Sequence, residues 1–250
     1  MKQDRREHLN GAVLVWLAQV SASQDSLPFL ESCLDLHEHE RATRFRFPED
    51  RARFVLGRGL LRKCLDCYLP QTAEKIEFVY TDRGRPVLQQ DKTVQFSISH
   101  THDLVAIALT AQARVGIDLE YVQPNLDPLE LARRIFSEED LRVFQALPPS
   151  EALPAFFRAW TRKEAYLKAR GEGIAEGLRL VSVSLGPEET AFLTDARDES
   201  AAQNWRLHTL PVSTEYAGCL ACDDGDKRVE YTFARFKKGE IIRDSWSGFS

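Results

Sequence analysis

The first half of the chain alternates between apolar runs with strand periodicity and segments with helical spacing. Alternating or continuous apolar positions predict strands over residues 12–18, 76–80, 94–98, 104–109 and 114–121. Helical spacing predicts a short helix over residues 36–47 and a long helix from Pro48 to about Tyr68. Pro48 suits a first helical position. The last three strands follow closely on one another, which favours an antiparallel meander.

The second half begins at a linker-like turn, Pro124–Asn125. A helix is expected over residues 129–135. Ser137 caps the next helix, with Asp140 at the position of a capping box. The other expected elements are a long helix over residues 151–169, ended by Gly171 and Gly173, and strands over residues 178–185, 205–210, 216–221 and 229–235.

The two halves share the order strand, helices, antiparallel strands. Residues 103–120 and 215–231 each have the pattern of a hairpin whose first arm is apolar. The order predicts an α+β fold of two similar halves, residues 1–122 and 123–250, related by a pseudo-twofold axis. A cleft between such halves is a common place for a ligand.

Composition and charge limit the classes of function. The chain has 250 residues, a 43% hydrophobic and 28% charged composition and a net charge of −5, so neither nucleic acid nor membrane is an expected partner. The first residues lack the apolar core of a secretory signal, so we expect a cytoplasmic protein. Positive charges nevertheless concentrate between Arg41 and Lys63, either as a solvated helix face or as a binding surface.

The cysteines do not form a zinc-binding pattern. Two pairs have C-x-x-C spacing, but one lies in the predicted helix that ends near Tyr68 and the other in the strand over residues 216–221. We therefore expect buried thiols rather than metal ligands. The absence of a disulfide pattern agrees with a reducing compartment. The five cysteines are Cys33, Cys64, Cys67, Cys219 and Cys222.

Two carboxylates share one face of the strand over residues 114–121. Side chains alternate along a strand, so Asp118 and Glu120 point to the same side, and carboxylates at this spacing can converge on one magnesium ion. Gly116 would allow a ligand or a neighbouring backbone to approach closely. The alternative is a half-buried strand with a solvated acidic face.

A second carboxylate motif lies in the helix over residues 151–169. Spacing by three and four places Phe157, Trp160, Glu164 and Lys168 on one inward stripe. One interpretation is an ordinary Glu–Lys pair at the rim of the stripe. The other is that Glu164 binds metal and Lys168 binds a phosphate oxygen.

Two further segments contain groups suited to phosphate. The strand over residues 94–98 runs into Ser99 and His100, which offer a hydroxyl donor and a titratable imidazole. The turn at Arg83, Gly84 and Arg85 places two guanidinium groups around a glycine, a set that can hold a phosphate. Each segment also has a plainer interpretation, as a local hydrogen-bond partner and as a surface turn.

The order of these motifs resembles a known family. Residues 116–120, followed by 160–168, resemble the G-I-D-x-E and W-x-x-K-E-A-x-x-K signatures of the Sfp-type 4′-phosphopantetheinyl transferases. The segments 84–86, 98–100 and 136–137 also fit, and the resemblance covers roughly residues 40–185. The subtype looks closest to the cyanobacterial enzymes, judged by residues 44–45, 47–49 and 57–59.

The resemblance implies an enzyme that moves the 4′-phosphopantetheine moiety of coenzyme A onto a serine of an apo acyl or peptidyl carrier protein. It implies coenzyme A in the cleft, Mg²⁺ as cofactor and 3′,5′-ADP as the product released. The expected roles are magnesium ligation by Asp118, Glu120 and Glu164, coenzyme A binding by Arg41, Arg83, Arg85, Ser99, His100, Asp118 and Lys168, and catalysis by Glu164, Lys168 and His100.

The sequence leaves four points open. The general base is expected to be Glu164, with Asp140 as the alternative. Ser97 stands where family members often have Asn, which puts its contact in doubt. Carriers of this kind are acidic, so Arg133 and Arg134 are a plausible docking patch on a protein expected to be a monomer. A phosphohydrolase using the same carboxylates and a binding module without chemistry are the competing functions.

Overall fold

The computed structural model describes residues 2–172, 177–237 and 240–244, in an α+β architecture that confirms the predicted fold class. They form two compact units. The first comprises the described residues up to Gln112 and those from Lys227 onward, and the second runs from Ala113 to Asp226. This division differs from the expected boundary at residue 122, because strand β6 (Val115–Tyr121) belongs to the second unit and the final strands belong to the first.

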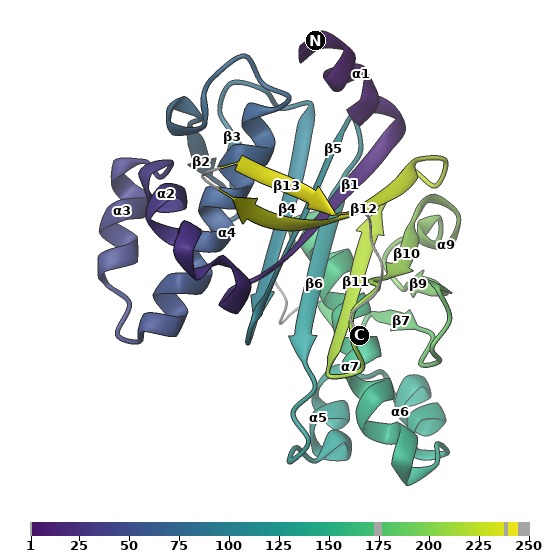
Figure 1. Ribbon diagram of the computed structural model, residues 1–250. Coiled ribbons are helices and arrows are strands. Elements are labelled where there is room, and N and C mark those ends of the chain that lie inside the picture. The colour runs from purple at the N-terminus through teal and green to yellow at the C-terminus, as the bar shows by residue number, and fades with distance from the viewer. Residues whose placement is uncertain (1, 173–176, 238–239, 245–250) are drawn as a thin grey trace. The chain divides into compact units, whose positions relative to one another are not determined.

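The first unit contains a five-stranded sheet in the order β13-β12-β1-β5-β4 (Figure 1). Strand β1 pairs in parallel with β12 and antiparallel with β5. The elements of this unit are α1 (Lys2–Gly11), β1 (Ala12–Gln19), the 3-10 helix η1 (Ser21–Ser26), α2 (Leu27–Ser32), α3 (Leu36–Thr43), α4 (Pro48–Asp66), the 3-10 helix η2 (Ala73–Lys75), β2 (Phe78–Tyr80), β3 (Pro86–Leu88), β4 (Val94–Thr101), β5 (Leu104–Ala111), β12 (Arg228–Lys237) and β13 (Glu240–Asp244).

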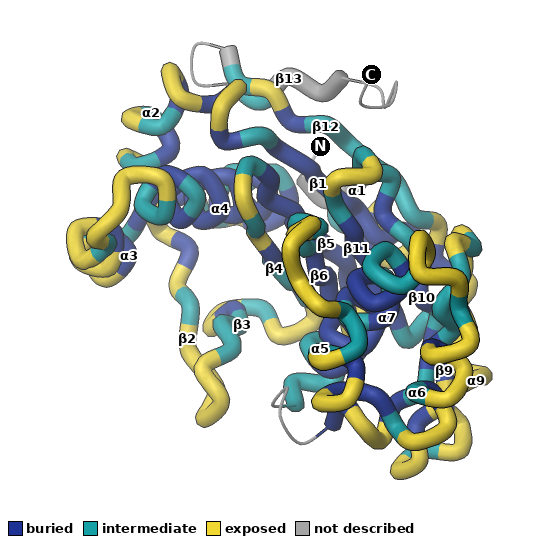
Figure 2. Tube along the Cα trace, turned by 90° about the horizontal axis from the view of Figure 1, so that it is seen from below, coloured by how far each residue is buried: buried dark blue, intermediate teal, exposed yellow. Residues whose placement is uncertain are grey.

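The centre of this sheet is buried on both faces, which explains why β1 and β5 are almost continuously apolar. Helix α4 packs on the sheet where Gly57 lies against Ile98 and Val105. Most of α4 is buried, whereas much of α3 is exposed (Figure 2). The hydrophobic core of the unit therefore lies between α4 and the sheet.

The second unit contains a four-stranded antiparallel sheet in the order β6-β11-β10-β8, covered by the long helix α7. A second, two-stranded sheet joins β7 and β9. The elements are β6, α5 (Pro128–Ile135), α6 (Glu138–Gln145), α7 (Pro149–Arg170), β7 (Val181–Val183), β8 (Thr190–Ala191), β9 (Leu193–Asp195), α9 (Ala201–Asn204), β10 (Arg206–Thr209) and β11 (Tyr216–Cys222).

The two predicted hairpins are wrong. Strands β5 and β6 follow each other in the chain but belong to different sheets, and so do β11 and β12. Strand β6 instead pairs with β11, whose sequence lies far away, with Asp118 opposite Cys219. The apolar pattern identified each strand correctly, but pairing between strands that are far apart in the sequence cannot be read from local spacing. The pseudo-twofold axis concerns the placement of the two units and stays a prediction.

Local features agree more closely with expectation. Helix α4 begins at Pro48, the side chain of Ser137 accepts a hydrogen bond from the Asp140 amide, and Gly171 ends α7 with φ of 71°. Gly173 lies outside the described residues. Helix α1 was not predicted, because its polar sequence has no apolar stripe. The five cysteines are free thiols, as expected, and four of them are buried.

Strand β6 and helix α7 approach unusually closely at Gly116. A Cβ atom at this position would lie 2.0 Å from the carbonyl oxygen of Ala165 and 2.5 Å from the amide nitrogen of Ala169. Only glycine permits this contact between the strand and the helix. The contact holds the acidic strand and the motif helix of the second unit against each other. Within the described residues, no helix combines the length and apolar character needed to span a membrane.

Candidate active site

The carboxylates of β6 face the same side of the strand, and their burial differs. Asp118 is 3% exposed, while Glu120 is half-buried nearer the end of the strand. Alternation along β6 turns Ile117 and Leu119 to the opposite face, where both are buried. The strand thus carries one deeply buried and one accessible carboxylate.

Helix α7 brings a cation to the buried carboxylate. The ammonium Nζ of Lys168 lies 2.5 Å from Oδ1 of Asp118 and donates a further hydrogen bond of 3.3 Å to the Ile117 carbonyl. The Lys168 side chain is 29% exposed, so it also reaches solvent. The ion pair between Lys168 and Asp118 therefore joins α7 to β6.

Glu164 is a buried acid whose pKa is raised. It is 3% exposed, and its Oε1 atom is buried with no hydrogen-bond donor among the residues that the structure describes. Burial, together with the negative charges of Asp118 and Glu120, raises the pKa of Glu164 to about 7, against a lowering by Lys168. A buried carboxylate oxygen of this kind is well suited to accept a metal ion or a proton.

Magnesium prefers oxygen ligands, and the three carboxylates can supply them. The buried Oε1 atom of Glu164, which has no hydrogen-bond donor among the described residues, is the feature of the structure that fits a bound cation. In the present side-chain arrangement, no group of three or more His, Cys, Asp or Glu side chains in the described ranges lies close enough to hold one ion. The ammonium of Lys168 offsets part of the charge on Asp118. Ligation by all three acids would require their side chains to converge.

Lys163 gives the alternative base a structural role. The Lys163 side chain is fully buried, and its Nζ lies 3.1 Å from Oδ2 of Asp140. It also donates to the carbonyl oxygens of Ile135 and Leu178, and burial lowers its pKa. Lys163 lies within the motif over residues 160–168 and was not predicted to have a role of its own, although its spacing from Phe156 places it on the apolar side of α7. Asp140 is therefore held by a buried cation within the second unit.

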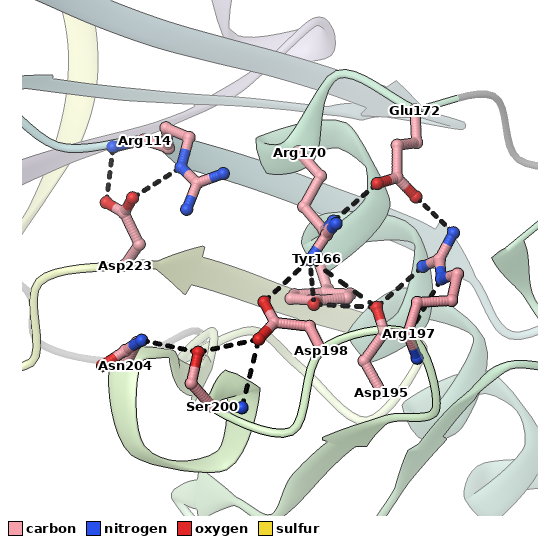
Figure 3. A network of polar contacts seen from close by, with 10 residues as sticks. All are labelled: Arg114, Tyr166, Arg170, Glu172, Asp195, Arg197, Asp198, Ser200, Asn204 and Asp223. Carbon is pink, nitrogen blue, oxygen red and sulfur yellow. Dashed lines mark hydrogen bonds and ion pairs between the residues drawn. The ribbon is translucent and has the colours of Figure 1, made fainter.

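The last turn of α7, which carries Lys168, is anchored by a polar network (Figure 3). Arg170 and Arg197 each donate a hydrogen bond of 2.6 Å to a different oxygen of Glu172. Arg197 also forms an ion pair with Asp195, whose Oδ2 accepts a hydrogen bond of 2.9 Å from the Tyr166 hydroxyl. This network joins the end of α7 to the segment after β9 and was not anticipated from the sequence.

In the first unit, Arg85 lies beside the edge strand β4. Its guanidinium donates to the Phe96 carbonyl at 3.5 Å, and burial lowers its pKa. A pocket of about 180 Å³ opens here, lined by Arg85, Pro86, Val87, Leu88, Lys92, Val94, Gln95 and Phe96. Two cations beside an apolar floor suit a ligand with both a ring and a phosphate.

Ser99 and His100 are neighbours on β4 and therefore point to opposite faces. Ser99 is buried and pairs with Ala106, whereas His100 is exposed on the face that also carries Phe96. The following turn is held by Arg53 of α4, which donates a 2.8 Å hydrogen bond to the His102 carbonyl. The two predicted phosphate donors thus share a strand but not a face.

The other two predicted cations are exposed. Arg41 lies in the last turn of α3, with its guanidinium 5.2 Å from the centre of the Phe54 ring. Arg83 lies in the turn between β2 and β3, two residues before Arg85. The structure describes the Arg41, Arg83, Arg85, Ser99 and His100 group within the first unit and the Asp118, Glu120, Glu164 and Lys168 group within the second.

Comparison with known proteins identifies the family. The family described as the 4′-phosphopantetheinyl transferase superfamily matches residues 114–221, and the N-terminal region of a 4′-phosphopantetheinyl transferase matches residues 18–112. The chain is 38% identical to the 4′-phosphopantetheinyl transferase HetI of Nostoc sp. over 75% of this chain and 80% of HetI. It is 30% identical to the 4′-phosphopantetheinyl transferase psf-1 of Bacillus pumilus over 78% of this chain and 87% of that protein.

A putative 4′-phosphopantetheinyl transferase of Synechocystis sp., slr0495, is 28% identical over 79% of each chain. Two of these three relatives come from cyanobacteria, in agreement with the predicted subtype. The matches confirm the predicted family and enzyme class: the chain belongs to the 4′-phosphopantetheinyl transferase superfamily.

Proposed function

We propose that this chain transfers the 4′-phosphopantetheine moiety of coenzyme A to a serine of an apo acyl or peptidyl carrier protein and releases 3′,5′-ADP. The observation that carries the proposal is the arrangement of β6 and α7, in which Lys168 contacts Asp118 beside the perturbed acid Glu164. These residues belong to the motifs that resemble the family, and the relatives named above are transferases of this type.

Magnesium would be held by Asp118, Glu120 and Glu164. When bound, it supplies positive charge that offsets the negative charge of the diphosphate. The partnerless buried oxygen of Glu164 supports this assignment, and the oxygen-only donor set suits a hard cation. The accessible position of Glu120 also suits ligation through a water molecule.

The remaining roles fall to side chains of the chain itself. Lys168 binds an oxygen of the diphosphate through its partly exposed ammonium. The carrier serine transfers its hydroxyl proton to the Glu164 carboxylate, its oxygen forms a bond to the β-phosphorus, and the bond from that phosphorus to 3′,5′-ADP breaks. Without a metal ion the pKa of Glu164 is about 7, so the carboxyl group can take up and release a proton near neutral pH. Asp140 is less suited because it is paired with Lys163.

The cations of the first unit would bind the nucleotide end of coenzyme A. Arg85 and the adjoining pocket suit the 3′-phosphate and adenosine, with Arg41 and Arg83 as further phosphate contacts. Ser99 and His100 would contact the phosphates from β4.

The proposal also covers the setting of the enzyme. Five free cysteines support a reducing compartment such as the cytoplasm. The net charge of −5 supports a protein whose partners are coenzyme A and a carrier protein rather than nucleic acid or a membrane, and the two internal units support a monomer.

The test is a direct transfer assay. The full chain is incubated with coenzyme A, Mg²⁺ and a panel of apo carrier proteins, and each carrier is weighed by mass spectrometry. We expect one carrier serine to gain one phosphopantetheine moiety and 3′,5′-ADP to appear in equal amount. Coenzyme A cleavage without a modified carrier would favour the phosphohydrolase, and coenzyme A binding without turnover would favour the binding module.

A further inference from the structure

A buried charge cluster in the first unit involves helices α3 and α4 and strand β2. Glu38 of α3 accepts hydrogen bonds from two arginines of α4, at 2.6 Å from Arg58 and 2.5 Å from Arg62. Asp35, the residue that caps α3, also pairs with Arg62. The side chains of Glu38, Arg58 and Arg62 are 3%, 8% and 0% exposed, so these charges are almost entirely removed from water.

The cluster also contacts the segment that leads into β2. Arg62 donates to the carbonyl oxygens of Ala73 and Ile76, the residues that lead into β2. Both guanidinium groups stack on the ring of Phe78 in β2, at 5.0 Å for Arg62 and 4.7 Å for Arg58. Arg62 and Arg58 therefore fix the first residues of the β2–β3 hairpin onto α4.

The contact with Tyr80 extends this connection to the hairpin turn. Arg58 donates a hydrogen bond of 3.0 Å to the Tyr80 hydroxyl, although the Tyr80 residue is 52% exposed. The next residue, Thr81, accepts hydrogen bonds on its side chain from the Arg85 amide and donates its own amide to the Arg85 carbonyl. An unbroken set of contacts therefore leads from α4 to the backbone of Arg85.

The same cluster holds the start of α3, the helix that carries Arg41. Glu38 and Asp35 form a capping box in which each side chain accepts a hydrogen bond from the backbone amide of the other. Arg41 follows Glu38 by three residues, one turn further along this short helix. The segments that carry Arg41 and Arg85 are thus both attached to Arg58 and Arg62 of α4.

We propose that Arg58, with Tyr80 and the buried Glu38–Arg62 pair, is a positioning group that sets the place of Arg85 relative to α3 and thereby the recognition of the 3′-phosphate of coenzyme A. This inference rests on the proposed function, because it takes coenzyme A as the ligand of Arg85. Arg58 and Tyr80 act through Arg85. Arginine is required at position 58 because its planar fork reaches Glu38 and Tyr80 together, which a single ammonium does not.

The experiment compares two gentle substitutions in the full chain. Tyr80→Phe removes only the hydroxyl that Arg58 bonds, and Arg58→Lys keeps a cation for Glu38. We expect each to weaken binding of coenzyme A, measured by calorimetry, about three- to tenfold, the net value of one ordinary hydrogen bond. Binding of dephospho-coenzyme A, which lacks the 3′-phosphate, and kcat for transfer should stay unchanged.

The controls separate positioning from other roles. Arg51→Lys is a matched change on α4, since Arg51 pairs with Glu31 outside the cluster, and it should leave both affinities unchanged. In an Arg85→Ala background, Tyr80→Phe should cause no further loss, because the group through which it acts is gone. Thermal unfolding of Tyr80→Phe should match the parent protein.

Three results would overturn the inference while leaving the transferase intact: an unchanged coenzyme A affinity in Tyr80→Phe, an equal loss for both nucleotides, or a loss in Tyr80→Phe with none in a folded Arg58→Lys. The last would mean that Tyr80 touches the ligand itself. If the parent protein bound no coenzyme A, the proposed function would fail, and this inference with it.

Discussion

The ammonium of Lys168 lies 2.5 Å from the Oδ1 oxygen of Asp118, which joins helix α7 to strand β6 within the second unit. Asp118 itself is 3% exposed, whereas the Lys168 side chain is 29% exposed. The pair therefore has a buried anion and an accessible cation. Under the proposed function, an incoming diphosphate is expected to bind Lys168 from solvent and to release Asp118 for a metal ion.

Replacement of Lys168 by Met is expected to reduce transfer sharply. Loss of one positive group that stabilises developing charge typically costs about a hundredfold or more in kcat. Because Lys168 lowers the pKa of Glu164, the substitution should also move that pKa above about 7 in the metal-free protein. The loss of kcat is measured in a transfer assay, and the pKa from the pH dependence of unfolding in chelator. Lys168→Arg, which keeps the charge, should retain more activity, and equal loss in both variants would argue against a charge-based role.

Glu164→Gln should stabilise the metal-free protein at high pH. The folded-state pKa of about 7 lies above the ordinary value of 4.5, so the protonated acid is favoured in the fold. This contribution is fully present below pH 4.5 and is lost as the pH rises through 7. The stability advantage of the variant should therefore grow by about 2–3 kcal/mol between pH 4.5 and 8.

Urea unfolding at a series of pH values in chelator measures this difference. Added Mg²⁺ should restore part of the lost stability of the parent protein but not change that of the variant. The reason is that an ion that binds only the folded state stabilises the folded state. Parallel stability curves for the two proteins would mean that Glu164 is not perturbed.

Gly116→Ala should separate strand β6 from helix α7. A Cβ there would lie 2.0 Å from the Ala165 carbonyl oxygen, a backbone atom that cannot turn aside. We expect a loss of about 3 kcal/mol or more in the free energy of unfolding, together with loss of activity because Glu164 moves. Gly11→Ala is the control, since nothing lies within 4 Å of its added Cβ. Similar stability of the two variants would refute the close packing.

Asp140→Asn should distinguish the two candidate bases. Because Asp140 pairs with buried Lys163, its loss should lower stability by roughly 3 kcal/mol, as expected when one partner of a buried ion pair is removed. Below its melting temperature the variant should keep most of its kcat, while Glu164→Gln should lose nearly all of it. The opposite ranking in a transfer assay would make Asp140 the base.

Reversal of charge at Arg133 and Arg134 should weaken docking of the carrier. Both are exposed on α5, and Arg179 donates to their carbonyl oxygens, which adds a third positive charge to this surface. In the double variant that combines Arg133→Glu and Arg134→Glu, KM for an acidic carrier should rise about tenfold at low salt. KM for coenzyme A should not change. Arg228→Glu, an exposed change on β12, is the control.

The sequence predicted the features that depend on neighbouring residues. Helix α4 begins at Pro48, Ser137 caps α6, and Gly171 ends α7, because each feature is decided within one or two turns of the chain. The apolar runs also located most of the longer strands. The acidic strand and the motif helix were identified in the same way.

Long-range partners could not be predicted. The spacing of Glu164 and Lys168 suggested a pair along one helix, but Lys168 bonds to Asp118, which is distant in sequence. The hairpins expected from β5–β6 and β11–β12 fail for the same reason, since strand pairing depends on how the whole sheet is assembled. Lys163 lay within a recognised motif, but its partner Asp140 becomes evident only when α6 packs on α7.

The position of β12 has a consequence for the biosynthesis of the protein. Strand β1, near the N-terminus, is flanked by β5 on one side and by β12 on the other. A ribosome making this chain has completed nearly all of the second unit before residues 228–237 emerge to cover the open edge of β1. The apolar edge of β1 in the first unit therefore stays uncovered until the second unit has been synthesised.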